Sequence, residues 1–149
     1  MRYSEYPGVG MRGVLRNLTQ KADVAHMAAK PREKITIASP EQDDSQTITH
    51  QWLWPTVSGF LRKGDVVVTE TGTSNFGILS TKLPPGGKAL AQILWGSIGW
   101  ATGALQGAAL AVKDSGKDDR TMLFIGDGSL QLSAQEISTM LRRDLHPIM

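Results

Sequence analysis

The sequence contains no cysteine, which excludes a disulfide framework and a thiolate metal site. It also lacks an apolar run long enough for a signal peptide or a membrane span, because the smoothest stretch, 98–112, is short and rich in glycine. No block of like charge appears, with 16 Lys and Arg against 14 Asp and Glu, so neither nucleic acid nor a membrane is expected as a partner. We therefore expect a soluble, cytoplasmic protein.

With 149 residues the chain is long enough for one compact domain or for part of a larger one. Residues 11–22 carry apolar side chains at helical spacing and predict a short amphipathic helix. The stretch 23–48 is polar and punctuated by prolines, so we interpret it as a linker, with 34–38 as a candidate strand.

From Thr49 onward the pattern alternates between helices and strands. The predicted helices are 49–63, 98–113 and 129–143, the last with Leu132, Ile137 and Leu141 on its inner side; the predicted strands are 65–70 and 121–125, and 146–149 begin another. Thr49 is a candidate N-cap of the first helix and Gly64 its stop, while Pro55 favours a later start near Trp54. The alternation predicts an α/β fold with a parallel sheet flanked by helices.

Three turns rich in small residues fall at the carboxyl ends of the predicted sheet, where ligands collect in such folds: 71–74, 95–99 and 126–129. Their glycines allow backbone N–H groups to approach an anion. Asp127 would repel a phosphate directly, but a divalent cation such as Mg²⁺ between the two removes the conflict. Asp127 is therefore a candidate Mg²⁺ ligand beside a diphosphate.

Each turn also has a structural interpretation. Asp127 can be the N-cap of the helix that follows it, and the hydroxyl residues at 71–74 can cap another helix. The glycines at 96–99 can serve close packing between a helix and the sheet. A further motif at 8–13, "GVGMRG", matches the dinucleotide-binding pattern Gly-x-Gly-x-x-Gly, but no predicted strand precedes it.

The segment "GDGSLQLSAQEISTMLRRDLHP", 126–147, resembles the start of the thiamine-diphosphate fingerprint, which opens with Gly-Asp-Gly and closes with Asn-Asn. Together with "GDVVVTETGTSNFGI" and "LWGSIGWATGALQGAALA", it resembles the pyruvate decarboxylase family of the fungal kind. The resemblance is dense over 49–149 and looser over 1–20, where "RYSEYPGVGM" is similar to the segment leaving that family's middle domain. It implies that residues 1–22 are the end of a preceding middle domain and that residues 49–149 are an incomplete, truncated diphosphate-binding domain, with residues 23–48 as the linker between them.

The resemblance also implies roles for individual residues. Asp127 would ligate Mg²⁺, Gly128 and Ser129 would contact the diphosphate of thiamine diphosphate, and Gly72 and Thr73 would line the cofactor from a neighbouring loop. Gly96 and Ile98 would bind the aminopyrimidine ring, and the Ile98 side chain would bend the cofactor into the shape that its chemistry needs, which makes Ile98 the one catalytic candidate. The thiazolium would then act as the electron sink for decarboxylation of pyruvate to acetaldehyde and CO2.

By the same resemblance the family's active site is shared between two domains, usually of two subunits in a homo-oligomer, a dimer or tetramer. The domain that supplies the activating glutamate is absent, and the closing Asn-Asn falls beyond Met149. His26, His50 and His146 match no catalytic position and are expected at the surface. We therefore expect a cofactor-binding piece that is inactive alone, with a non-catalytic module that pairs with a full-length decarboxylase as the alternative.

Overall fold

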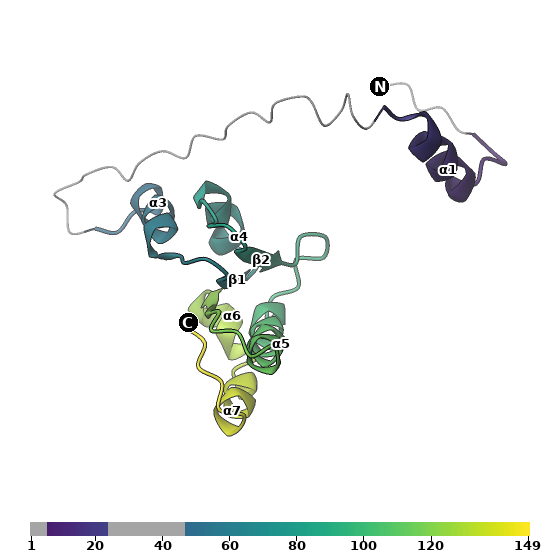
Figure 1. Ribbon diagram of the computed structural model, residues 1–149. Helices are drawn as coiled ribbons and strands as arrows, with labels where there is room; N and C mark the ends of the chain where they lie inside the picture. Colours follow the sequence, from purple (N-terminus) through teal and green to yellow (C-terminus); the bar gives the residue numbers. More distant parts are fainter. Residues whose placement is uncertain (1–5, 24–46) are drawn as a thin grey trace. The chain divides into compact units, whose positions relative to one another are not determined.

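The computed structural model describes residues 6–23 and 47–149, which fall into two units (Figure 1). In the first unit, helix α1 (Met11–Lys21) confirms the predicted helix, and its apolar side chains Val14, Leu15 and Leu18 are exposed. The predicted linker at 23–48, with its candidate strand, lies almost entirely outside the described residues. All the following elements belong to the second unit.

The second unit is built on a parallel sheet of three strands, β1 (Val66–Thr69), β2 (Lys88–Ala91) and β3 (Thr121–Phe124), in the order β2-β1-β3. The central strand β1 is buried along its whole length, as the continuous run of β-branched residues predicted. Ile148 pairs with Met122 in a parallel bridge, which confirms that the last residues run beside β3. The predicted α/β fold with a parallel sheet flanked by helices is confirmed.

One face of the sheet is covered by helices α5 (Trp100–Asp114) and α7 (Gln135–Arg142) (Figure 1). The cluster on this face joins strand residues to apolar residues of both helices and of the C-terminal segment, and its buried members are Val68, Ala101, Leu105, Ala109, Leu123, Met140 and Leu145. The alanines of α5 bring the helix close to the strands. The predicted helix at 98–113 is thereby confirmed, with its start two residues later.

The opposite face is covered by helix α3 (His50–Phe60), whose Trp54 is almost completely buried. Trp54 packs with Val67 of β1 and Met122 of β3, and its ring lies against Phe124, with centroids 5.3 Å apart. Because neighbouring residues of a strand point to opposite faces, Val67 lies in this layer and Val68 in the other. Helices thus flank the sheet on both sides.

The prediction that Pro55 delays the start of the first helix is wrong. Helix α3 begins at His50, and Thr49 caps it by accepting a hydrogen bond from the Trp52 N–H at 3.2 Å. Pro55 removes a bond to the carbonyl of Gln51, an exposed residue in the first turn, where water can replace the missing partner. The helix ends at Phe60, and Gly64 forms the following turn with φ +88°.

The stretch after β1, predicted as a turn, contains a short helix α4 (Thr73–Gly77) that continues into the 3-10 helix η1 (Ile78–Ser80). Thr69 fixes this connection to the sheet, since its hydroxyl donates to Asn75 Oδ1 at 2.6 Å. Strand β2 was not predicted, because its sequence Lys-Ala-Leu-Ala lacks the β-branched and aromatic residues typical of strands. Its exposed edge position explains why such residues are tolerated.

The predicted helix at 129–143 is two helices, α6 (Asp127–Gln131) and α7, separated by a bend over 132–134. The prediction that Leu132 and Leu141 lie on the inner side is wrong, since they are 61% and 73% exposed. Met140 takes the buried position instead, packed against α5. The bend places Leu132 outside α7, so Leu132 no longer shares a helix face with Ile137.

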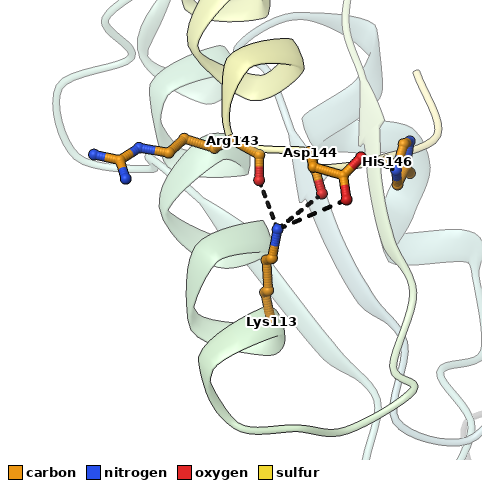
Figure 2. A network of polar contacts seen from close by, with 4 residues as sticks. All are labelled: Lys113, Arg143, Asp144 and His146. Atoms are coloured by element: carbon orange, nitrogen blue, oxygen red, sulfur yellow. Dashed lines mark hydrogen bonds and ion pairs between the residues drawn. The ribbon is translucent and has the colours of Figure 1, made fainter.

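The C-terminal end of α7 is held by a lysine of α5 (Figure 2). Lys113 Nζ donates to the backbone carbonyls of Arg143 at 2.7 Å and of Asp144 at 3.2 Å, and lies 4.0 Å from the Asp144 carboxylate. These carbonyls come from the end of a helix, where backbone acceptors lack partners within the helix.

Among the described residues, no helix combines the length and apolar character needed to cross a bilayer.

Candidate functional site

Three loops leave the sheet at the same edge. The last residue of β1, Thr69, pairs in register with Ala91, the last of β2, and with Phe124, the last of β3. The loops that follow contain the predicted turns at 71–74, 95–99 and 126–129. Because the strands are parallel, the three turns begin at the carboxyl end of one small sheet.

Glu70, the residue after β1, joins the first two turns. Its Oε1 accepts a hydrogen bond from the Thr71 N–H at 2.7 Å, and its Oε2 accepts from the N–H groups of Gly99 at 2.9 Å and Ala101 at 3.2 Å. Glu70 also donates its own N–H to the Phe124 carbonyl at 3.0 Å, beside the third turn. The side chain is 1% exposed, so these contacts lie in the interior.

Close packing joins the second turn to both of its neighbours. A Cβ at Gly96, where φ is +58°, would lie 3.4 Å from Thr71 Cγ2. A Cβ at Gly99, where φ is +90°, would lie 3.0 Å from Leu132 Cβ and 3.7 Å from Ser133 Oγ. The glycines of 95–99 therefore lie between the 71–74 turn and the residues that follow α6, which is the packing role that glycine permits.

Asp127 is the first residue of α6 and is exposed. The cap position belongs to Gly126, and no side chain makes a capping bond there, so the N-cap interpretation of Asp127 does not hold. Gly126 and Gly128 have open space where a Cβ would be built. The third turn thus presents a carboxylate, with Gly128 exposed and Ser129 partly buried beside it.

The first turn shows a similar absence of capping. Gly72 precedes α4 with φ +131° and open space beside its Cα, and no side chain makes a capping bond to this helix. Thr73 is exposed at the start of α4. Thr71 Oγ1, and Ser133 Oγ next to Gly99, are buried hydroxyl oxygens without a hydrogen-bond partner in the described part of the chain. Buried polar atoms without a protein partner are places where water or a ligand can bind; Thr71 belongs to the first turn, and Ser133 lies beside Gly99 of the second.

Ile98 is exposed by 57% although it is a large apolar residue. Its loop is braced from within, since Gln92 Oε1 accepts from the Ser97 N–H at 2.6 Å. The same loop exposes Ile93, Leu94 and Trp95 by 84%, 91% and 83%. Such a concentration of apolar side chains in one exposed loop is typical of a surface that contacts a ligand or another chain.

No three metal-binding side chains gather within residues 6–23 and 47–149. A site made of protein ligands alone is therefore not formed by these residues. Mg²⁺, however, is often held by one or two carboxylates together with phosphate oxygens and water. The single exposed carboxylate of Asp127, beside open glycine backbone, has the chemistry of such a shared site.

Sequence reasoning left Glu70 without a role, although it directly follows the buried strand β1, at the edge of the sheet where the three predicted turns begin. Two of its partners, Gly99 and Ala101, are about thirty positions away in the sequence, and a backbone partner leaves no pattern of side chains to find. The "GVGMRG" segment lies at the start of α1, with Gly10 at its N-cap, and no strand precedes it within the described residues.

Comparison with protein families gives a match over residues 70–149 to the thiamine pyrophosphate enzyme C-terminal TPP binding domain. The chain is 52% identical to a pyruvate decarboxylase of Aspergillus terreus, 50% to one of Aspergillus fumigatus and 48% to one of Kluyveromyces lactis, over 99% of its own length. It spans 26% of each of these relatives. A solved structure described as a "putative thiamin diphosphate-dependent enzyme" from Mycobacterium smegmatis matches 90% of the chain and 26% of that protein, with a TM-score of 0.62 and 26% identity.

Proposed function

The chain belongs to the thiamine pyrophosphate enzyme family, through its C-terminal TPP-binding domain, and we propose on this premise that it is the cofactor-binding portion of a non-oxidative 2-oxo acid decarboxylase. The whole protein would convert pyruvate to acetaldehyde and CO2, which is supported by the names of the relatives. The observation that carries the proposal is that three glycine-bearing turns follow parallel strands at one sheet edge, and that Glu70 joins two of these turns through hydrogen bonds to Thr71 and Gly99. Because the chain spans 26% of these relatives, we expect it to be inactive alone.

Thiamine diphosphate fits the three turns by chemistry. The open backbone at Gly72 and Gly128, with the hydroxyls of Thr73 and Ser129, suits diphosphate oxygens. The proposed aminopyrimidine contacts are Gly96 and Ile98, and the exposed Ile98 side chain offers the apolar surface that a bent cofactor needs. When bound, the cofactor would supply a thiazolium electron sink for decarboxylation.

Mg²⁺ resolves the electrostatic conflict at Asp127. Two anions in contact repel, and a doubly charged ion between the carboxylate and the diphosphate turns the repulsion into attraction. Asp127 is free to act in this way because it makes no capping bond at α6. Glu70, the other acidic group at this edge, already accepts three backbone hydrogen bonds and is therefore not proposed as a metal ligand.

Titration calorimetry on the 149-residue chain tests both parts of this proposal. We expect thiamine diphosphate to bind in the presence of Mg²⁺ and to bind at least about tenfold more weakly without it. Asp127→Ala should abolish the Mg²⁺ dependence, while Asp118→Ala, which removes another exposed carboxylate, should not. A wild-type chain that does not bind the cofactor, or an Asp127→Ala variant that keeps the Mg²⁺ dependence, would overturn the assignment.

Activity of the isolated chain is a separate test. With thiamine diphosphate, Mg²⁺ and pyruvate, we expect no acetaldehyde above the level of a protein-free control. Sustained turnover would contradict the proposal that the reaction needs other parts of the whole protein.

We further propose that the whole protein is a cytoplasmic homo-oligomer, a dimer or tetramer. The absence of cysteine supports the cytoplasmic location, and the exposed apolar loop at 93–95 supports the association of subunits.

A second function is favoured by that same loop. Ile93, Leu94 and Trp95 would suit a non-catalytic module that pairs with a full-length decarboxylase and alters its assembly. The inner side of α5 does not contribute to this surface, since Ala101, Leu105 and Ala109 pack on the sheet. Co-purification with an intact decarboxylase subunit, lost in Trp95→Ser, together with no cofactor binding by the chain alone, would favour this second function.

A further inference from the structure

We propose that Glu70 is a positioning residue that clamps the loop bearing Gly96 and Ile98 against the loop bearing Gly72 and Thr73, and so fixes the cofactor turns before the cofactor arrives. The effect on cofactor binding rests on the proposed function, whereas the link between the two loops follows from the hydrogen bonds of Glu70 alone. Neither the sequence motifs nor the family resemblance gave this residue a role.

The carboxylate of Glu70 is buried and fully engaged. Its two oxygens accept hydrogen bonds from three backbone N–H groups, those of Thr71, Gly99 and Ala101, at 2.7 to 3.2 Å. No ion pair within the described residues involves it. A buried charge is costly unless it is well hydrogen-bonded, and here the N–H groups, two of them at the start of α5, compensate for it. This arrangement requires the two loops to lie together.

The start of α5 explains why the acceptor for its first N–H groups is a side chain from the end of a strand, and not a capping residue of the helix itself. Its cap residue, Gly99, has φ +90°, and a Cβ there would lie 3.0 Å from Leu132 Cβ. The turn therefore requires glycine, which has no side chain to cap the helix. The first N–H groups of α5 need an acceptor from elsewhere. Glu70 provides it from the end of β1, and the cap becomes a bond between two loops.

The same bonds affect where an anion can bind. A helix amino terminus attracts phosphate groups, but that of α5 is already occupied by a carboxylate. The negative charge of Glu70 therefore keeps the cofactor diphosphate away from α5 and leaves it to the turns at 71–74 and 126–129. Glu70 would thus serve the orientation of the cofactor as well as the position of the loop.

Two substitutions separate charge from reach. In Glu70→Gln, the amide oxygen can still accept from Gly99 and Ala101, but the amide NH₂ then faces the Thr71 N–H, donor against donor. In Glu70→Asp, the charge stays but the side chain is shorter by one methylene, so it cannot reach both loops at hydrogen-bond distance. Val57→Ala is the control, because Val57 is a buried residue of α3 on the opposite face of the sheet.

The experiment combines amide hydrogen exchange with calorimetry on the 149-residue chain, at a temperature where circular dichroism shows each variant folded. In each Glu70 variant, amide exchange should rise by at least about tenfold either at Thr71 or at both Gly99 and Ala101. Each variant should also raise the Kd for thiamine diphosphate with Mg²⁺ by at least about tenfold. Val57→Ala should raise exchange broadly and leave the Kd of the folded chain unchanged.

Equal effects of Val57→Ala and the Glu70 variants on exchange at these amides and on the Kd would reduce Glu70 to an ordinary stability residue and overturn the clamp. If Glu70→Gln does not fold, Glu70→Asp and the protection of the wild-type amides decide: amides that exchange freely in the wild type contradict the clamp. A wild-type chain that protects these amides but binds no cofactor would overturn the proposed function and leave the clamp standing.

Discussion

Arg120 and Asp65, the residues directly before strands β3 and β1, form a bidentate ion pair. Arg120 Nη2 lies 2.6 Å from Asp65 Oδ2, and Arg120 Nε lies 3.1 Å from Asp65 Oδ1. The same guanidinium donates to the Phe60 carbonyl at 2.9 Å and lies 4.7 Å from the centre of the Phe60 ring. Arg120 therefore ties the end of α3 to the turn that leads into β1. The carboxylate also accepts the Arg62 N–H at 2.7 Å, so the whole turn depends on its charge.

The ion pair predicts a stability that depends on pH. Burial by itself raises the pKa of Asp65, but the hydrogen bonds from Arg120 and the Arg62 N–H, with the Arg120 charge, outweigh it and hold the pKa below the ordinary value of 3.8. A lowered pKa stabilises the fold above the unfolded-state value, and the contribution is lost as pH falls through the folded-state pKa. We expect Asp65→Asn to lower the free energy of unfolding by about 1–3 kcal/mol near neutral pH.

Urea unfolding at several pH values checks this prediction. The difference between wild type and Asp65→Asn should shrink toward zero as the pH falls well below 3.8, because the wild-type carboxyl is then protonated as well. Asp118→Asn, at an exposed position, is the control. A difference that stays constant down to the acid range would show that the charge of Asp65 does not carry the effect.

Two helical glycines give a matched pair for packing. Gly77 has helical φ and ψ of −64° and −39°, yet a Cβ there would collide with the indole of Trp54. Gly59, in α3, has open space at the same atom. Gly77→Ala should destabilise the fold by about 1–3 kcal/mol, whereas Gly59→Ala should stabilise it by roughly 0.5–1 kcal/mol through backbone entropy. Thermal or urea unfolding measures both, and equal effects at the two positions would contradict the packing argument.

Ile98 gives a test of binding that is separate from stability. Because its side chain is 57% exposed, Ile98→Ala should change the free energy of unfolding by no more than about 0.5 kcal/mol. If it supports the cofactor, the lost contact should weaken thiamine diphosphate binding by roughly tenfold or more. Ile93→Ala, from the same loop and 84% exposed, is the control and should leave calorimetric binding unchanged. Equal binding by the two variants would remove Ile98 from the site.

Lys113 should stabilise the C-terminal segment locally. Lys113→Met keeps much of the apolar length of the side chain but removes its bonds to the carbonyls of Arg143 and Asp144 (Figure 2). We expect a loss of about 0.5–1.5 kcal/mol and faster amide exchange at Leu145, whose N–H donates to the Met140 carbonyl at 2.9 Å. Lys117→Met, at an exposed position beyond α5, should have neither effect. Unchanged exchange at Leu145 would contradict the role of Lys113.

The parallel sheet could be predicted wherever the strand sequence itself carried the signal. The Val-Val-Val run of β1 and the apolar run of β3 have no good alternative to burial within a sheet. Strand β2 could not be found in this way, because an edge strand of Lys, Ala and Leu owes its structure to pairing with β1 and not to its own propensity. The bend between α6 and α7 was likewise not predicted; it lies next to Gly99, a residue from a distant part of the sequence.

In the candidate site, too, features with a signal in the local sequence could be predicted, whereas contacts between distant residues could not. That the loops after β1 and β3 meet at one edge follows from the parallel order, and glycine-rich sequence marked the turns in advance. The role of Asp127 rests on an electrostatic argument together with the resemblance, those of Ile98 and the cofactor-binding glycines rest on the resemblance, and all of them stay predictions. Glu70 could not be predicted, because its partners are backbone N–H groups that any residue provides, and only the folded chain brings them to its carboxylate.

The strand order has a consequence for how the chain reaches its native state. Among the strands of the described residues, β1 comes first in the sequence but lies in the middle of the sheet, with partners at Lys88–Ala91 and Thr121–Phe124. During synthesis the apolar side chains of β1 therefore stay uncovered until first β2 and later β3 has been made and can pair with it. Pairing between strands distant in sequence is slow and exposes unpaired strand edges that favour aggregation, so we expect the chain to be most prone to aggregate in the interval before β3 is made.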